Sequence, residues 1–191
     1  MMRKSILSRY ARNIAGKIIL DVAAARVSDL YQNFDKVSPF LKKDLDPQLA
    51  DYLLESLREI GKEPFEIRIT LDEKPTEELM NRVKNSFASF FSYMEELEQR
   101  SMGYKARVSL LLFVAGIGFL SLAALVSDFI SEDSSTIIHV FPEGITVAGW
   151  VALWNAIATF LIEWAPLRRR ISTYRRLAAA KITISTDPSQ K

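Results

Sequence analysis

Two runs of apolar residues dominate the hydropathy pattern of the chain. The first, VSLLLFVAGIGFLSLAALVS at residues 108–127, contains no charged residue, and the second, ITVAGWVALWNAIATFLIEW at residues 145–164, contains one near its end. Twenty residues of α-helix extend about 30 Å, the thickness of the hydrocarbon core of a bilayer. The pattern predicts two transmembrane helices, because the rest of the chain is too short to enclose two such helices in a soluble core.

Shorter periodic patterns precede and follow these runs. Residues 45–63 place apolar residues on one helical face between Asp46, a suitable N-cap, and Gly61, so they predict a helix. FEIRITL at residues 65–71 and KITIST at residues 181–186 alternate apolar and polar residues, as half-buried strands do. The two segments predict a two-stranded sheet, paired either within one chain or between subunits.

A heptad pattern leads from Thr76 into the first apolar run. Its positions alternate steps of three and four residues. They are Met80, Val83, Phe87, Phe90, Met94, Leu97, Ser101, Tyr104, Val108 and Leu111. No proline interrupts them, so one long helix is predicted to continue into the first span. Ile171, Tyr174 and Leu177 predict a similar continuation after the second span.

The first twenty residues are basic and amphipathic. They contain five basic residues and no acidic one. On a helical wheel, one side collects Leu7, Tyr10, Ala11, Ile14 and Ile18. This pattern predicts a helix that either lies on the inner membrane surface or packs on the soluble domain.

The predicted fold is a mainly α membrane protein. It consists of a two-helix transmembrane hairpin with long cytoplasmic helical extensions and a small α+β cytoplasmic domain containing a two-stranded sheet. The predicted segments are a basic amphipathic N-terminal helix at 1–34, an α+β domain with the heptad helix at 35–105, transmembrane helices at 106–130 and 145–165, an acidic external loop at 131–144, and a basic cytoplasmic helix with a terminal strand at 166–191.

The distribution of charge orients the predicted hairpin. No lysine or arginine occurs between Arg107 and Arg168, whereas the connection SDFISEDSSTIIHVFPEG carries four acidic residues. By the positive-inside rule, both termini face the cytoplasm and the loop faces outward. The predicted location is the inner (plasma) membrane, with membrane lipids as partners. Trp164, Arg168, Arg169 and Arg170 are expected to anchor the second span at the lipid headgroups.

Composition narrows the chemistry further. The chain has no cysteine, and His139 is its single histidine. Thiol nucleophiles and cysteine metal sites are therefore excluded, and a histidine relay or a multi-histidine metal site lacks its residues. Positive and negative charges nearly balance, and no Walker, kinase, lipase or HExxH pattern occurs. We expect no catalytic residue, no metal, no cofactor and no nucleic acid partner.

The second apolar run carries small and polar residues at regular spacing. The small residues recur every four positions, which lets helix backbones approach closely. They are Gly144, Ala148, Ala152 and Ala156, and the polar residues that follow on an adjoining strip are Asn155, Thr159 and Glu163. One interpretation is an oligomer interface, with Glu163 paired to Lys105, Arg107 or Arg168. The other is a pore-lining or proton-linked strip. In the first run, Gly116 and Gly118 predict close helix packing.

The stretch EGITVAGWVALWNAIATFLIEWAPLRRRISTYRRLAAAKITI, residues 143–184, resembles an uncharacterised family of small prokaryotic two-span membrane proteins. The segment EGITVAGWVALW, the exit EWAPLRRR and a short terminal strand carry the resemblance. Asn155 and Ala156 stand where that family is expected to have Arg-Pro. The resemblance implies an architecture and no activity. The layout is also similar to two-span effector modules thought to form membrane pores in bacterial defence systems.

Three functional hypotheses follow from the sequence. The leading one is a non-enzymatic membrane scaffold or accessory subunit that forms a homo-oligomer, with a possible membrane protein partner. The alternative is an oligomeric pore or ion channel lined by the second span. A membrane-bound enzyme would need a convergent acidic pocket in the folded domain.

Overall fold

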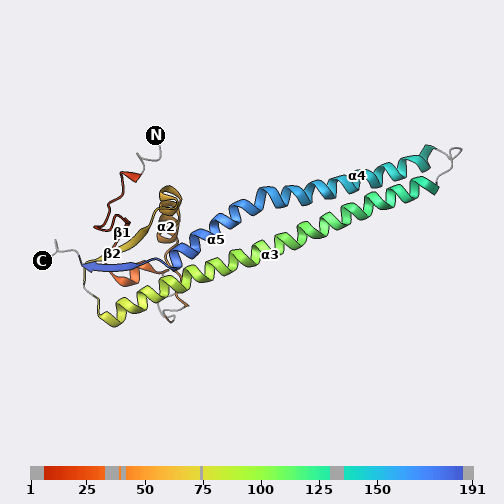
Figure 1. Cartoon of the computed structure of the whole chain (residues 1–191). Helices are drawn as coiled ribbons and strands as arrows, with labels where there is room; N and C mark the ends of the chain where they lie inside the picture. Colours follow the sequence, from red (N-terminus) through yellow and green to blue (C-terminus); the bar gives the residue numbers. More distant parts are fainter. Residues whose placement is uncertain (1–6, 33–38, 40–41, 74, 130–135, 187–191) are drawn as a thin grey trace. The chain divides into compact units, whose positions relative to one another are not determined.

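The structure is a computed structural model, which describes residues 7–32, 39, 42–73, 75–129 and 136–186. The chain divides into two compact units. The sheet unit comprises the residues up to Glu96 and those from Ile171 onward, and the hairpin unit comprises Leu97–Arg170. Two long helices belong partly to each unit (Figure 1).

The sheet unit is built on a three-stranded parallel sheet. Its strands are β1 (Ile18–Ala24), β2 (Phe65–Leu71) and β3 (Ile182–Thr186), in the order β1-β2-β3. In register, β1 starts opposite the start of β2, and Ile67 of β2 lies opposite Ile182 of β3. The predicted pairing of the two sequence-derived strands is therefore confirmed, and it occurs within one chain. The prediction of only two strands is wrong.

The third strand, β1, lies in the segment that was expected to be an N-terminal helix. Between Ser8 and Gln32 the chain contains β1 and a 3-10 turn at Val27–Leu30, but no α-helix. The helix predicted for residues 1–34 is therefore wrong in this part, whereas residues 1–6 and 33–34 lie outside the described residues. Ile14 was placed on the apolar helical face, yet its side chain is fully exposed. The apolar residues from Ile18 onward are buried because they form a strand.

The helices of the sheet unit follow their sequence signals. α2 (Pro47–Ile60) begins after Asp46, whose side chain accepts hydrogen bonds from two backbone N–H groups of the first turn. It ends at Gly61, whose φ of 64° lies in the left-handed region that glycine adopts without strain. Helix, N-cap and C-terminal glycine were all predicted. α3 (Glu77–Phe129) is one continuous helix, as the uninterrupted heptad pattern indicated.

One hydrophobic core joins the sheet to its helices. Alternate residues of β2, Ile67, Ile69 and Leu71, are almost completely buried. They belong to the same cluster as Phe87 and Phe91 of α3 and side chains of α2 and β1. The opposite side of the sheet is more polar, since the register partners there include the half-exposed pair Asp21 and Arg68. A sheet with one packed and one polar face explains the alternation in FEIRITL.

The hairpin unit consists of the second part of α3 and the helix that returns beside it. The returning helix comprises α4 (Thr136–Ala158), a π-helical turn (Thr159–Glu163) and the start of α5 (Trp164–Ala178). Continuation of the second span into α5 was predicted. The external loop expected at residues 131–144 is shorter, because α4 already begins at Thr136 and includes Pro142. Residues 130–135 lie outside the described part.

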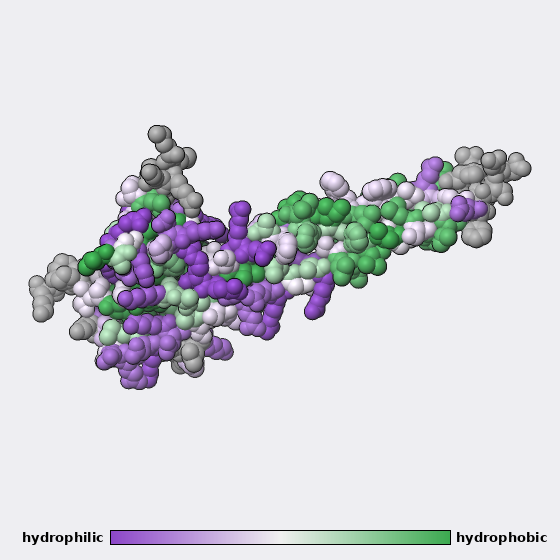
Figure 2. Space-filling view, viewed as in Figure 1, coloured by the Kyte–Doolittle hydropathy of each residue, from purple (hydrophilic) through white to green (hydrophobic). Residues whose placement is uncertain are grey.

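Both long helices are apolar enough to cross a membrane, judged by length and composition. In the most apolar stretch of each helix, only 17% and 11% of the residues are buried. Figure 2 shows hydrophobic side chains gathered over α3 and α4, while the sheet unit presents mostly hydrophilic ones. The two helices are therefore not the buried core helices of a soluble domain. An exposed apolar surface of this extent is typical of contact with lipid or with another protein.

The heptad positions of α3 do not stay on one packed face. Val83, Phe87 and Phe90 are buried in the sheet unit, but Tyr104 and Leu111 are 70% and 68% exposed. A straight α-helix drifts about 20° per heptad, so four heptads turn the predicted stripe by roughly 80°. In the hairpin unit the buried face of α3 instead includes Ser109, Gly116 and Ala123.

Candidate functional site in the helical hairpin

Two glycines bring α3 and α4 into close contact. A Cβ atom added at Gly116 of α3 would lie 2.7 Å from Leu153 Cγ and 3.0 Å from the carbonyl oxygen of Gly149. A Cβ added at Gly149 of α4 would lie 2.9 Å from Leu120 Cγ and 3.1 Å from the carbonyl oxygen of Gly116. A side chain at either position would therefore force the facing helix to shift. Gly118 makes no such close approach within the chain, because a Cβ there would meet nothing within 4 Å.

The predicted stripe of small residues is divided between two faces of α4. Each step of four residues turns a stripe by about 40° around an α-helix, so it does not stay on one face. Ala156 is buried and Ala152 half-buried, whereas Gly144 and Ala148 are exposed. Asn155 is exposed too and lies within about 20° of Gly144 and of Ala148 around the helix. These three exposed residues, Gly144, Ala148 and Asn155, form what we call the uncovered strip of α4.

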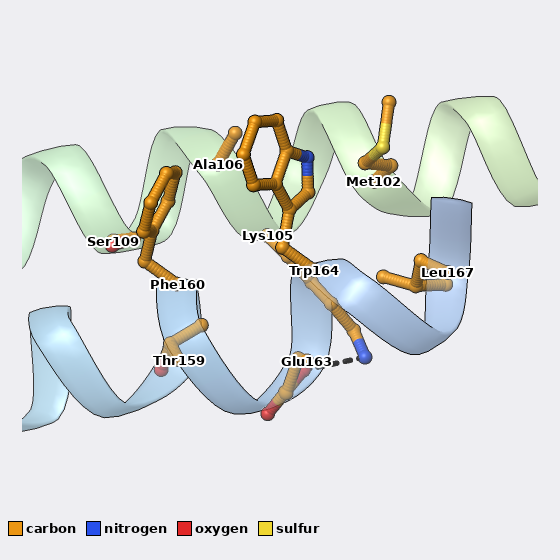
Figure 3. Close-up of a pocket in the computed structure, with 9 residues that line it drawn as sticks. All are labelled: Met102, Lys105, Ala106, Ser109, Thr159, Phe160, Glu163, Trp164 and Leu167. Atoms are coloured by element: carbon orange, nitrogen blue, oxygen red, sulfur yellow. Dashed lines mark ion pairs between the residues drawn. The ribbon is translucent and has the colours of Figure 1, made fainter. Parts of the chain in front are cut away.

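Glu163, the last residue of the π-helical turn, forms an ion pair with α3. Its Oε2 atom lies 2.6 Å from Nζ of Lys105 on α3, and both side chains are about two-fifths exposed. Lys105 was among the three predicted partners. The pair borders a small cavity of about 100 Å³, which Thr159 also lines. Figure 3 shows the Lys105 side chain reaching from α3 to the Glu163 carboxylate.

Aromatic and basic side chains surround this cavity. The rings of Phe160 and Trp164 stack with centroids 4.7 Å apart, and both residues line the cavity. The guanidinium carbon of Arg168 lies 5.1 Å from the centroid of the Trp164 ring, which is a cation–π contact. Arg169 is exposed, and Arg170 pairs with Glu98 at 3.3 Å. Of the expected headgroup anchors, Trp164 lines the cavity, Arg168 contacts the Trp164 ring, and Arg169 and Arg170 lie on exposed helical surface further along α5.

A buried hydrogen bond ties α3 to α4 close to the π-helical turn. The Ser109 hydroxyl donates to the backbone carbonyl of Ala156 at 2.7 Å, and Ser109 is only 9% exposed. The π-helical turn starts three residues later, at Thr159. Such turns contain one extra residue and change which side chains face a neighbouring helix. Here the buried and half-buried positions Thr159, Glu163 and Leu167 follow one another at steps of four.

Replacing Ser109 by alanine is expected to lower the unfolding free energy of the hairpin by about 1 kcal/mol, since that is the usual strength of an interhelical hydrogen bond of this type. Titration of the detergent-solubilised chain with sodium dodecyl sulfate, followed by tryptophan emission, measures this change. All three tryptophans lie in the hairpin unit. Ser121→Ala, at an exposed position of the same helix, is the matched control and should leave the midpoint unchanged. Equal loss in both variants would contradict a role for this hydrogen bond.

The described contacts within the hairpin are apolar packing, a hydrogen bond, ion pairs and a cation–π contact. Among the described residues, no three His, Cys, Asp or Glu side chains come together as a metal site would require. Thr159 and Glu163 were named from the sequence as candidate site residues, and both line the cavity between α3 and the returning helix. Ser109 and Gly149, which also join the two helices, were not named. Serine and glycine are common in apolar helices, so only the position of the facing helix distinguishes these two.

Comparison of the chain with models of protein families, with curated proteins and with solved structures finds no match.

Proposed function

We propose that this protein is a non-enzymatic integral membrane protein that acts as an oligomeric scaffold or accessory subunit. Its hairpin crosses the membrane twice, and the uncovered strip of α4 contacts a second copy of the chain. The exposed Asn155 amide carries this proposal. It sits at the centre of the second apolar run, residues 145–164, and an amide that faces lipid leaves its hydrogen-bonding groups unsatisfied.

The pairing of β2 with β3 supports a hairpin with two crossings. Both candidate spans lie in the chain between these two strands, yet the strands belong to one sheet. Two crossings return the chain to the side from which it started, as this pairing requires. The three exposed arginines after the second span favour the cytoplasm for that side, and exposed Asp128 and Glu143 near the turn favour the opposite one. We accordingly propose the inner (plasma) membrane, with both termini cytoplasmic.

The form of the uncovered strip favours a helix as its partner. Gly144 and Ala148 carry little or no side chain, so another helix can approach α4 closely enough for the Asn155 amide to reach it. Large apolar side chains occupy a neighbouring exposed region, where Trp150 and Trp154 are 62% and 72% exposed. Trp150 and Trp154 suit lipid contact, whereas the strip between Gly144 and Asn155 suits protein contact.

A pore lined by the second span is the alternative proposal. It would use Asn155, Thr159 and Glu163 on a common axis. However, Thr159 and Glu163 line a cavity against α3, and Glu163 is already paired with Lys105. Of the three residues, Asn155 alone has an exposed position on the uncovered strip. A pore lined by all three residues would require Thr159 and Glu163 to leave their positions against α3, whereas a scaffold leaves those contacts in place.

The double substitution Ala148→Leu with Asn155→Leu is expected to shift the purified chain from oligomer to monomer in mild detergent. It removes the amide and fills the space through which a second helix would approach. Loss of an interhelical amide alone lowers an association constant by about fivefold, and the added leucine at position 148 increases the effect. Analytical ultracentrifugation measures the association constant.

Trp154→Leu is the matched control, because Trp154 is exposed on the same helix about 100° from Asn155. It should leave the oligomer intact. A wild-type chain that is monomeric in lipid nanodiscs would contradict the proposal. Ion flux through liposomes that is lost in the Asn155→Leu variant would instead favour the pore.

A further inference from the structure

A basic hollow lies at the end of the sheet where its three strands begin. Parallel strands start at the same edge, so residues far apart in the sequence meet there. Lys17 directly precedes β1, Lys181 directly precedes β3, and Lys62 lies in the connection before β2. All three lysines line one hollow of about 360 Å³ in the sheet unit. It is a shallow, open depression on the surface of the sheet unit.

The charge of this hollow is strongly unbalanced. Four basic residues line it, against the single acidic residue Glu63. Glu63 is itself 3.9 Å from Arg12, so its charge is partly offset from outside the lining. Within the described part of the chain, no carboxylate forms an ion pair with Lys17, Lys62 or Lys181. Positive charges that border one hollow without counter-charges repel one another, and a bound anion reduces that repulsion.

The fourth basic residue, Arg176, holds one wall of the hollow in place. Its guanidinium donates to the backbone carbonyls of Gly61 and of Glu63, the latter at 2.7 Å. It also lies 5.2 Å from the centroid of the Phe65 ring. Burial lowers the pKa of Arg176 from its ordinary value, which is the sign of a cation partly removed from water. Arg176 thus fixes the turn that carries Lys62 next to the start of β2.

We propose that this hollow is a binding site for a phosphate-bearing anion. Lysine ammonium groups on separate backbone segments can surround a phosphate from several directions, as compact point charges do in phosphate sites. The anion is either a soluble phosphate compound or the headgroup of an anionic phospholipid. The site is formed entirely by the sheet unit, so it does not depend on how the hairpin assembles or whether it crosses a membrane.

Inorganic pyrophosphate is the probe for this site. Calorimetric titration of the full-length chain in detergent at low salt should give a dissociation constant that rises about tenfold in the double variant Lys62→Gln/Lys181→Gln. The matched control is Lys42→Gln/Lys84→Gln, which removes two exposed lysines elsewhere in the sheet unit and changes the net charge equally. Its dissociation constant should stay within about twofold of wild type. Circular dichroism verifies that both variants are folded.

A second measurement separates the two sources of phosphate. The titration is repeated in nanodiscs of phosphatidylcholine alone and in nanodiscs that also contain phosphatidylglycerol. If a lipid headgroup occupies the hollow, phosphatidylglycerol weakens pyrophosphate binding to the control variant but not the residual binding to Lys62→Gln/Lys181→Gln. If the ligand is soluble, binding is the same in both kinds of disc. Absence of pyrophosphate binding to wild type in all media, or equal affinity of the two double variants, overturns the proposal.

Discussion

Gly116→Leu is expected to destabilise the hairpin by about 3 kcal/mol. Even the first added carbon would lie 2.7 Å from Leu153 Cγ and 3.0 Å from the Gly149 carbonyl oxygen. The second of these atoms belongs to the backbone, so a side-chain rotation cannot relieve the overlap. The two helices must separate, which also breaks the hydrogen bond from Ser109 to Ala156.

The change is measured by sodium dodecyl sulfate titration with tryptophan emission as the signal. Gly118→Leu is the matched control on the same helix, two residues away, where an added Cβ meets nothing within 4 Å. It should be neutral or slightly stabilising, because leucine has a higher helix propensity than glycine. If Gly116→Leu and Gly118→Leu had the same midpoint, the close approach at Gly116 would be refuted.

Phe87→Ala is expected to cost the sheet unit about 4 kcal/mol, the usual loss for an aromatic side chain in a packed core. Phe87 is 0% exposed and makes an edge-to-face contact with Phe91 at a centroid distance of 6.5 Å. Its removal leaves a cavity between α3 and the sheet, to whose core cluster both belong. Hydrogen exchange of the β2 amides, followed by mass spectrometry, should become about a thousandfold faster.

Tyr93→Ala provides the comparison for this effect. Tyr93 is an aromatic residue of the same helix, but 54% of it is exposed. Its replacement should change the free energy of unfolding by no more than about 0.5 kcal/mol. If the β2 amides of the Phe87→Ala variant exchanged hydrogen at the wild-type rate, α3 would not stabilise the sheet.

The sequence predicted those elements whose signals are local. The N-cap Asp46 with Gly61, and the alternation of FEIRITL, define α2 and β2 almost to the residue. The length and apolar character of the two runs predicted the long helices, because these properties need no knowledge of neighbours. The pairing of β2 with β3 followed from the need of each strand for a partner.

β1 was not predicted from the sequence, because its strand-like alternation directly follows a segment whose spacing fits an amphipathic helix. IILDVAA alternates at Ile18, Leu20 and Val22, but it follows basic residues whose spacing also fits an amphipathic helix. Tertiary pairing with β2 decides between the two patterns. The direction of the strands was equally hidden, since parallel and antiparallel pairing of three short strands satisfy the same alternation.

The candidate site was only partly predictable, and the reason is geometric. A four-residue spacing of small residues was interpreted as one face of α4, although it winds around the helix. The face that packs on α3 combines Gly149, Ala156 and Glu163, while Gly144 and Ala148 share a face with Asn155. Without the position of α3, no sequence pattern separates these two sets.

The position of β3 in the sequence has a consequence for biosynthesis. β2 is made before the hairpin and β3 after it, and their paired residues Thr70 and Ser185 are 115 positions apart. A nascent chain therefore carries β2 with one vacant edge until translation has passed both long helices. A strand with a vacant edge can pair with another chain and tends to aggregate. The sheet can therefore be completed only after the whole hairpin has been synthesised.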